Sequence, residues 1–196
     1  MAENGSKRGK VACLLASGFE DSEFRIPTDR LRQAGYQVDI IGMKAGEKLQ
    51  GEKGKETAVP NLSIDEAEAD DYVALLIPGG YSPDKLRADP RFVEFVKEFD
   101  ATGRPLAAVC HGPQLLLTAE LVKGRRLTAW STVQGDLRQA GARVVDEPVV
   151  VDDNWITSRK PDDLEAFSAK LLEELSEMEE RSGIQSPNEQ ALPPLA

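Results

Sequence analysis

The chain has 196 residues, of which 40% are hydrophobic and 30% charged, the composition of an ordinary soluble globular protein. This length suits one well-cored domain and is short for two. The net charge of −10 argues against a nucleic-acid or anionic-membrane partner, because binding to phosphates needs a basic face.

The two cysteines, Cys13 and Cys110, each follow apolar residues rather than forming a spaced framework, which indicates a reducing compartment. Residues 1–10 contain no apolar signal core, and no apolar run approaches membrane-spanning length. We therefore expect a cytoplasmic protein. The single histidine, His111, excludes a metal site built on histidines, and two cysteines are too few for a thiolate zinc site. We expect no metal and no cofactor.

The first half of the chain alternates apolar runs with a helical pattern. Residues 10–15 and 36–42 predict buried strands, separated by a helix that ends at Gly35. Pro27 lies within that helix and should break or kink it into a short segment and a main one. The polar, glycine-rich residues 43–66 predict a small β-excursion.

The second half continues the alternation. Residues 72–78 predict a buried strand that runs into Gly79-Gly80, and Asp89-Pro90 caps a helix. The remaining predicted elements are a strand at 126–129, a helix at 132–140, a hairpin at 149–158 and a last helix from 161 to 181. This order predicts one domain over residues 8–181 with a doubly wound, mostly parallel α/β sheet sandwiched by helices, followed by a tail at 182–196.

The most informative stretch is the strand at 105–109, which ends at Cys110, turns through His111-Gly112 and starts a helix with Pro113. A cysteine on such a turn projects at the carboxyl edge of the sheet, where the N–H groups of the following helix favour a thiolate. This context predicts a thiol pKa below the free value of about 8.5. The alternative is a small, inert, buried hydrophobe, which describes most unpaired cysteines.

Three features fall at the carboxyl ends of predicted strands: Glu20, Gly79-Gly80 and Cys110. In doubly wound sheets, binding sites form at that edge, so these residues are expected to meet in one site. His111 is the neighbour of Cys110 in sequence, and adjacent residues on a tight turn rarely point at each other well. An outside partner is therefore expected to orient the imidazole.

Six motifs resemble, in order, those of the ThiJ/PfpI superfamily, in the PfpI-like branch of intracellular proteases and stress proteins. They are the residues at 18–23, 76–84, 108–116, 124–129, 149–152 and 157–164. The resemblance covers about residues 9–176 and leaves out the tail. It implies a flavodoxin-like fold similar to that of class I glutamine amidotransferases. Amidotransferase activity itself is disfavoured, since those domains use a late histidine that this chain lacks.

The resemblance also implies roles for individual residues. Cys110 matches the nucleophile, and Glu20 matches the carboxylate beside it. Gly80 and His111 match the positions whose backbone N–H groups form an oxyanion hole. Asp84 stands where PfpI-like members have an acid, often glutamate, that a neighbouring subunit supplies to the histidine. The implied protein is a homodimer or larger homo-oligomer whose site is completed between chains.

The resemblance implies three alternative functions. The first is a stress-response enzyme of the deglycase or glutathione-independent glyoxalase type, in which Cys110 attacks a reactive dicarbonyl or its protein adduct. The second is an intracellular cysteine peptidase. The third is a redox-sensing or chaperone-like stress protein that acts through oxidation of Cys110.

Overall fold

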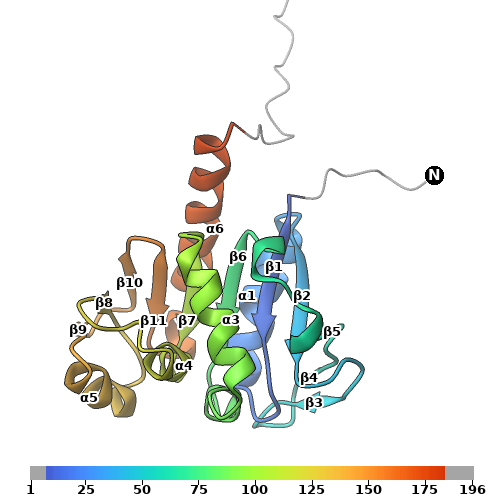
Figure 1. Cartoon of the computed structure of the whole chain (residues 1–196), viewed down its shortest axis with the longest axis horizontal. Coiled ribbons are helices and arrows are strands. Elements are labelled where there is room, and N and C mark those ends of the chain that lie inside the picture. The colour runs from blue at the N-terminus through green and yellow to red at the C-terminus, as the bar shows by residue number, and fades with distance from the viewer. Residues whose placement is uncertain (1–7, 184–196) are drawn as a thin grey trace, which may run out of the picture.

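A seven-stranded sheet runs through the centre of the molecule (Figure 1). The computed structural model describes residues 8–183, and all neighbouring strands of this sheet are parallel except the antiparallel pair at one edge. In sheet order the strands are β10 (Val149–Asp152), β11 (Trp155–Ser158), β7 (Leu106–Val109), β6 (Ala74–Ile77), β1 (Lys10–Leu14), β2 (Gln37–Gly42) and β5 (Leu62–Ser63). The predicted doubly wound α/β architecture is confirmed.

Helices cover both faces of the sheet and create two separate apolar cores. One core lies under α1 (Asp21–Gln33) and α6 (Leu164–Arg181). The other lies under α3 (Pro90–Ala101), α4 (Pro113–Thr118) and α5 (Ser131–Gln139). The four central strands are buried on both faces, which explains why they appear in the sequence as continuous apolar runs rather than alternating ones.

Short elements complete the fold. The β-excursion is confirmed as an antiparallel hairpin of β3 (Leu49–Gln50) and β4 (Thr57–Ala58) that leads to β5. A small parallel pair, β8 (Arg126–Leu127) and β9 (Arg143–Val144), precedes the edge hairpin. The remaining elements are α2 (Ser82–Leu86) and the 3-10 turns Ile64–Glu66, Ala69–Asp71 and Pro161–Asp163.

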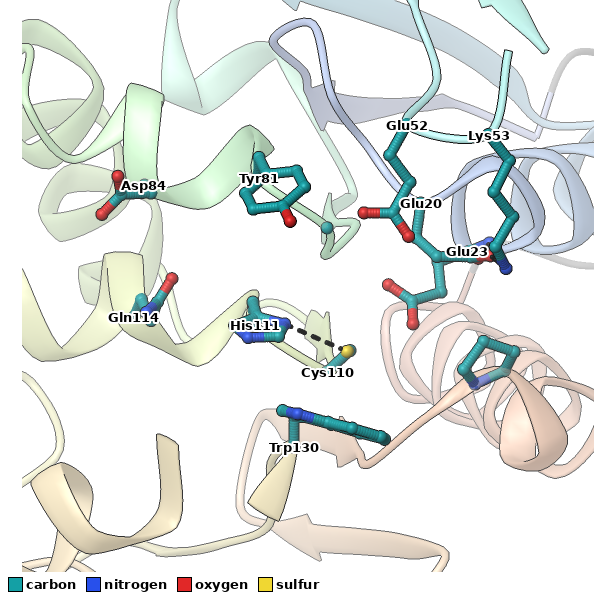
Figure 2. A pocket seen from close by; sticks show the side chains of 12 residues that line it. Glu20, Glu23, Glu52, Lys53, Tyr81, Asp84, Cys110, His111, Gln114 and Trp130 are labelled. Atoms are coloured by element: carbon teal, nitrogen blue, oxygen red, sulfur yellow. Dashed lines mark hydrogen bonds and ion pairs between the residues drawn. The ribbon is translucent and has the colours of Figure 1, made fainter. Parts of the chain in front are cut away.

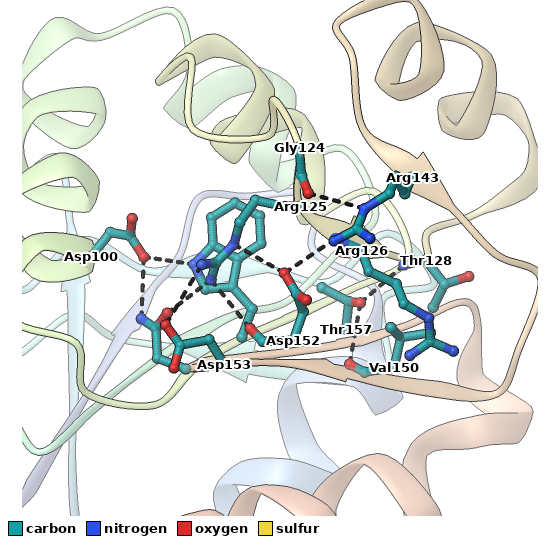
Figure 3. A network of polar contacts seen from close by, with 12 residues as sticks. Asp100, Gly124, Arg125, Arg126, Thr128, Arg143, Val150, Asp152, Asp153 and Thr157 are labelled. Atoms are coloured by element: carbon teal, nitrogen blue, oxygen red, sulfur yellow. Dashed lines mark hydrogen bonds and ion pairs between the residues drawn. The ribbon is translucent and has the colours of Figure 1, made fainter.

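A polar network joins the β8–β9 unit to the main sheet (Figure 3). The guanidinium of Arg125 lies 4.2 Å from the centre of the Trp155 ring and hydrogen-bonds to Asn154 at 2.8 Å. The indole N–H of Trp155 donates to Asp100 at 2.6 Å, which ties β11 to α3. Stacking on an aromatic face and charge-assisted hydrogen bonds thus attach the β8–β9 unit and α3 to the edge hairpin of β10 and β11.

The prediction that Pro27 divides its helix is wrong, because α1 is continuous through that residue. An interior proline removes one helical hydrogen bond and costs about 3 kcal/mol. Pro27 itself is buried, and so are Phe24 and Leu31 on the face that packs against the α6 layer. Burial of this face offsets the lost hydrogen bond.

Within residues 8–183, no helix is both long and apolar enough to cross a membrane. Of the predicted tail at 182–196, residues 184–196 lie outside the described part of the chain.

Candidate active site

Cys110 sits at a strained turn between β7 and α4. Its φ of 61° lies in the left-handed region that residues with a side chain rarely adopt. Backbone hydrogen bonds hold the turn on both sides: the N–H of Cys110 donates to Ser158 on β11, and its carbonyl accepts from Trp130. These hydrogen bonds therefore hold the strained turn and place the thiol at the carboxyl edge of the sheet, as the strand-turn-helix pattern predicts.

The turn at Gly79-Gly80, which follows β6, contacts the loop that follows β1 at the same edge of the sheet. Gly80 has a φ of +74°, and a Cβ on it would clash with the backbone of Gly18 and Glu20. Two backbone hydrogen bonds join the segments, from Glu20 to Gly79 and from Tyr81 to Gly18. Only glycine permits this approach, which brings the Gly80 backbone to the thiol of Cys110.

A cavity of about 480 Å³ opens over the cysteine (Figure 2). Its walls come from six separate parts of the chain, and its lining includes the site residues expected from the sequence: Glu20, Gly80, Asp84, Cys110 and His111. Its lining residues are Glu20, Glu23, Glu52, Lys53, Gly80, Tyr81, Asp84, Cys110, His111, Gln114, Trp130 and Pro161.

The carboxyl group that lies against the thiol belongs to Glu23, in the first turn of α1. Its side chain is fully buried, and one oxygen accepts a 3.0 Å hydrogen bond from the N–H of Gly79. Glu23 and Cys110 shift each other's pKa, whereas Glu20 is not among the main causes of the shift at the thiol. Burial, followed by the negative charge of Glu20, raises the pKa of Glu23 to about 8. Glu23 therefore holds its proton at neutral pH.

The expectation that Glu20 lies beside the thiol is corrected by this geometry. Glu20 is the N-cap of α1, and its carboxylate accepts hydrogen bonds from the N–H of Glu23, the hydroxyl of Ser22 and the ammonium of Lys53. Burial acts to raise the pKa of Glu20, but these donors outweigh it and hold the pKa below its usual value. Glu20 is thus a permanently charged capping group.

The expectation of a lowered thiol pKa is also wrong. Burial, and then the charge and hydrogen bonding of Glu23, raise the pKa of Cys110 above its ordinary value. The backbone N–H groups of His111 and Gly80 act in the opposite direction, because they stabilise the thiolate. Cys110 and Glu23 therefore form a pair of acids, and ionisation of either one opposes ionisation of the other.

His111 and Asp84 lie on the other side of the cysteine. The Nδ1 atom of His111 is 3.3 Å from Sγ of Cys110, and burial lowers the pKa of the imidazole. Within residues 8–183, no carboxylate hydrogen-bonds to this ring. Asp84 lines the cavity but pairs at 2.7 Å with Arg87, the C-cap of α2. A partner that orients the imidazole is therefore absent from the described part of this chain.

Several residues of the cavity escaped the sequence analysis. Glu23 could have been found from its spacing, because a glutamate three residues after an N-cap lies on the first turn of the helix. Tyr81 and Trp130 are large aromatic side chains with exposed fractions of 69% and 36%. Glu52 and Lys53 reach the cavity from the β3–β4 hairpin, far from any motif. No local pattern identifies them.

The chain is similar to curated proteins over most of its length. It is 48% identical over 164 residues to "Protein/nucleic acid deglycase 2" of Escherichia coli, which covers 83% of this chain and 95% of that protein. It is 44% identical over 164 residues, with the same coverage, to "General stress protein 18" of Bacillus subtilis.

The chain is also similar to solved structures over most of its length. A two-domain protein of Anabaena variabilis, with DJ-1/ThiJ/PfpI-like and ferritin-like domains, superposes with a TM-score of 0.84 at 38% identity, covering 94% of this chain and 52% of that one. DJ-1beta of Drosophila melanogaster superposes with a TM-score of 0.78 at 25% identity, covering 91% of this chain and 99% of that one. The family model described as "DJ-1/PfpI family" matches residues 9–174. The chain therefore belongs to the DJ-1/PfpI family.

Proposed function

We propose that this protein is a cysteine-dependent enzyme that acts on reactive dicarbonyls or their early adducts on amines, as a deglycase or glyoxalase. The observation that carries the proposal is the buried pair of Cys110 and Glu23, a nucleophile beside a proton donor whose pKa lies near neutrality. The deglycase name of the Escherichia coli relative supports it. Because both cysteines are free, we place the enzyme in a reducing compartment such as the cytoplasm.

In the proposed reaction, the thiol of Cys110 first loses its proton to water, and the thiolate adds to the aldehyde carbon of methylglyoxal. For an adduct, the carbinol first releases the amine and regenerates this aldehyde. The carboxyl group of Glu23 gives its proton to the new alkoxide, which yields a hemithioacetal. The resulting Glu23 carboxylate then removes the proton from the same carbon, leaving an enediolate whose negative oxygen is stabilised by the N–H groups of Gly80 and His111.

Glu23 returns its proton to the second carbon while the hydroxyl proton moves between the two oxygens, giving a lactoyl thioester of Cys110. Water hydrolyses this thioester and frees the thiol. At the end of the cycle, water returns to the Glu23 carboxylate the proton that Cys110 lost at the start. The sum is methylglyoxal plus water to lactate, or adduct plus water to free amine and lactate. The buried carboxyl group of Glu23 suits this proton transfer, because a pKa of about 8 lets it both give and accept a proton near neutral pH.

The test compares kcat/KM for methylglyoxal in two glutamine variants. Glu23→Gln keeps the shape of the site but cannot carry the proton, so we expect a loss of at least 100-fold. Glu20→Gln removes the capping carboxylate three residues away and serves as the matched control, with a much smaller loss expected. Full activity in Glu23→Gln would remove Glu23 from the mechanism, whereas equal losses in the two variants would show that Glu23 acts only together with the charge of Glu20.

The same experiment separates the alternative functions. A wild-type protein without dicarbonyl turnover, but with cleavage of an unfolded protein that Cys110→Ser abolishes, would show a peptidase. Oxidation of Cys110 as the only measurable response would show a redox sensor. The peptidase is the less supported alternative, since a general base at His111 would need an orienting acid and none in residues 8–183 contacts the ring.

A further inference from the structure

The charges that line the active-site cavity do not balance. Lys53 is its only cationic lining residue within residues 8–183, and its ammonium is already paired with Glu20 at 2.7 Å. Asp84 is paired with Arg87. Glu52 has no ion pair and no side-chain hydrogen bond to the described residues, and in Figure 2 its carboxyl group points into the cavity. Glu52 therefore brings to the cavity a negative charge that no ion pair neutralises, and the Lys53 ammonium acts on it only beyond ion-pair distance.

The surroundings of Glu52 favour an incoming positive charge. Burial, followed by the negative charge of Glu20, raises the pKa of Glu52, so its ionised form is destabilised where it stands. A cation next to this carboxylate would relieve both effects. An anion would add repulsion from Glu20 and Glu52 in a cleft that focuses the field.

Two aromatic side chains line the cavity near the thiol. In Figure 2, Tyr81 and Trp130 lie on opposite sides of Cys110, and the cavity opens between them. Both rings are substantially exposed and neither belongs to a hydrophobic core. An exposed aromatic face attracts a guanidinium or an ammonium group at about 0.5–2 kcal/mol, and it gives no such preference for an anion.

The segment that carries Glu52 is held rigidly. The N–H of Glu52 donates to the carbonyl of Phe19 at 2.8 Å. The buried carboxylate of Asp21 accepts three backbone hydrogen bonds from the next residues, at 2.9 Å from Lys53 and 2.8 Å from both Lys55 and Glu56. The backbone that carries Glu52 is therefore fixed at the rim of the cavity before any substrate arrives, so little backbone ordering is needed on binding.

We propose that Glu52 is a specificity-determining residue that, with Tyr81 and Trp130, selects substrates carried on a cationic side chain. The preferred class is the dicarbonyl adduct of a guanidinium or ammonium group, and phosphate-bearing nucleotide adducts are disfavoured. The proposal rests on the proposed function for its substrate, but the charge preference of the cavity can be measured without turnover.

The first experiment measures the reaction of Cys110 with two thiol reagents of similar size and opposite charge. The probes are 2-(trimethylammonium)ethyl methanethiosulfonate and 2-sulfonatoethyl methanethiosulfonate, with mass mapping of the labelled cysteine. Each rate constant is divided by that of a free cysteine derivative. We expect the cationic reagent to be favoured on the order of tenfold. Glu52→Gln should reduce this ratio at least threefold, whereas Glu47→Gln, which removes an equal charge outside the cavity, should leave it unchanged.

The second experiment compares kcat/KM for free methylglyoxal, which is neutral, with that for the early methylglyoxal adduct of Nα-acetyl-arginine methylamide. Glu52→Gln should lower the value for the arginine adduct severalfold and change that for methylglyoxal by less than twofold. Equal normalised rates for the two charged reagents, or a ratio that Glu52→Gln does not change, would overturn the proposal. If neither substrate is turned over by the wild type, the proposed function fails while the reagent ratio still decides the charge preference.

Discussion

Glu20 and Glu23 are three residues apart in one helical turn, yet their environments give them opposite protonation states. Glu20 is charged because three donors surround its carboxylate. Glu23 receives a single backbone N–H and otherwise interacts with the thiol of Cys110, so desolvation dominates. The two roles are connected, since the charge of Glu20 helps to keep the proton on Glu23.

The pairing of Glu23 with Cys110 predicts a distinctive pH profile for thiol alkylation. Below about pH 7, Glu23 is protonated and resembles glutamine, so wild type and Glu23→Gln should react at similar rates. Above pH 8, Glu23 ionises and holds the proton on Cys110, because two neighbouring negative charges repel. We therefore expect Glu23→Gln to be alkylated faster than wild type at pH 9, measured with iodoacetamide and mass mapping.

Cys13 provides an internal control for that measurement. It is fully buried in β1, and burial raises the pKa of its thiol to about 12. It should stay unlabelled across the same range in both proteins. Superimposable Cys110 profiles above pH 8 would contradict the coupling between the carboxyl group and the thiol.

The raised pKa of Glu23 also predicts how its replacement changes stability. Between the unfolded pKa of about 4.3 and the folded pKa of about 8, only the folded state keeps this proton. The Glu23 contribution therefore favours folding at low pH and is lost as the pH rises through this window. Glu23→Gln should gain stability relative to wild type between pH 5 and pH 8, by on the order of 3 kcal/mol, measured by urea unfolding. A pH-independent difference between the two proteins would disprove it.

At the scale of elements, α1 organises one side of the site from its first turn. Glu20 caps the helix, Asp21 holds the segment after β3, and Glu23 reaches the thiol. The buried Asp21 carboxylate has a pKa below its usual value: burial acts to raise it, and the backbone N–H groups of the loop outweigh this. One helix end thus positions both the proton donor and the loop that carries Glu52.

Replacing Asp21 should release this loop. Asp21→Ala leaves three backbone N–H groups without their acceptor, at a cost of about 1–3 kcal/mol in the free energy of unfolding. Amide hydrogen exchange at Lys53, Lys55 and Glu56 should become faster. Asp29→Ala, a half-buried position on the same helix, is the matched control and should cost less than about 1 kcal/mol. Unchanged exchange at the three amides would show that another contact holds the loop.

At the scale of the whole molecule, the site looks incomplete within one chain. His111 has no orienting acid in the described residues. Asp84 is an exposed acid that lines the cavity, and its one ion pair within the described residues is with Arg87. We predict an oligomer in which Asp84 of one subunit meets His111 of the next. A charged hydrogen bond of this kind contributes about 1.5–3 kcal/mol, enough to fix the ring.

Subunit mixing tests this arrangement. Asp84→Ala should lower dicarbonyl turnover while the fold stays intact, and Cys110→Ser should abolish it. Mixed oligomers of the two variants should regain activity, because some sites then combine a wild-type aspartate with a wild-type cysteine. An active monomer in sedimentation, or mixed oligomers without recovery, would show that each chain builds its own site.

Most of the architecture was predictable from sequence because it depends on local patterns. Buried runs of four or more apolar residues, such as those of β6 and β7, indicate strands of a sheet that is covered by helices on both faces. The turn at Cys110 and the glycines after β6 mark the carboxyl edge, so the place of the site followed as well. The continuity of α1 through Pro27 did not follow, since burial against a distant layer overrides a local preference.

Which carboxyl group faces the thiol was decided only by the tertiary structure. In sequence, Glu20 and Glu23 are equivalent members of one acidic loop. Folding brings Lys53 to the first and Gly79 to the second, so one glutamate stays charged beside a cation and the other is desolvated against Cys110. The sequence thus determined the residue types and the sheet edge where they gather. Protonation and charge in the cavity depend on contacts between segments more than 30 residues apart, which no local pattern records.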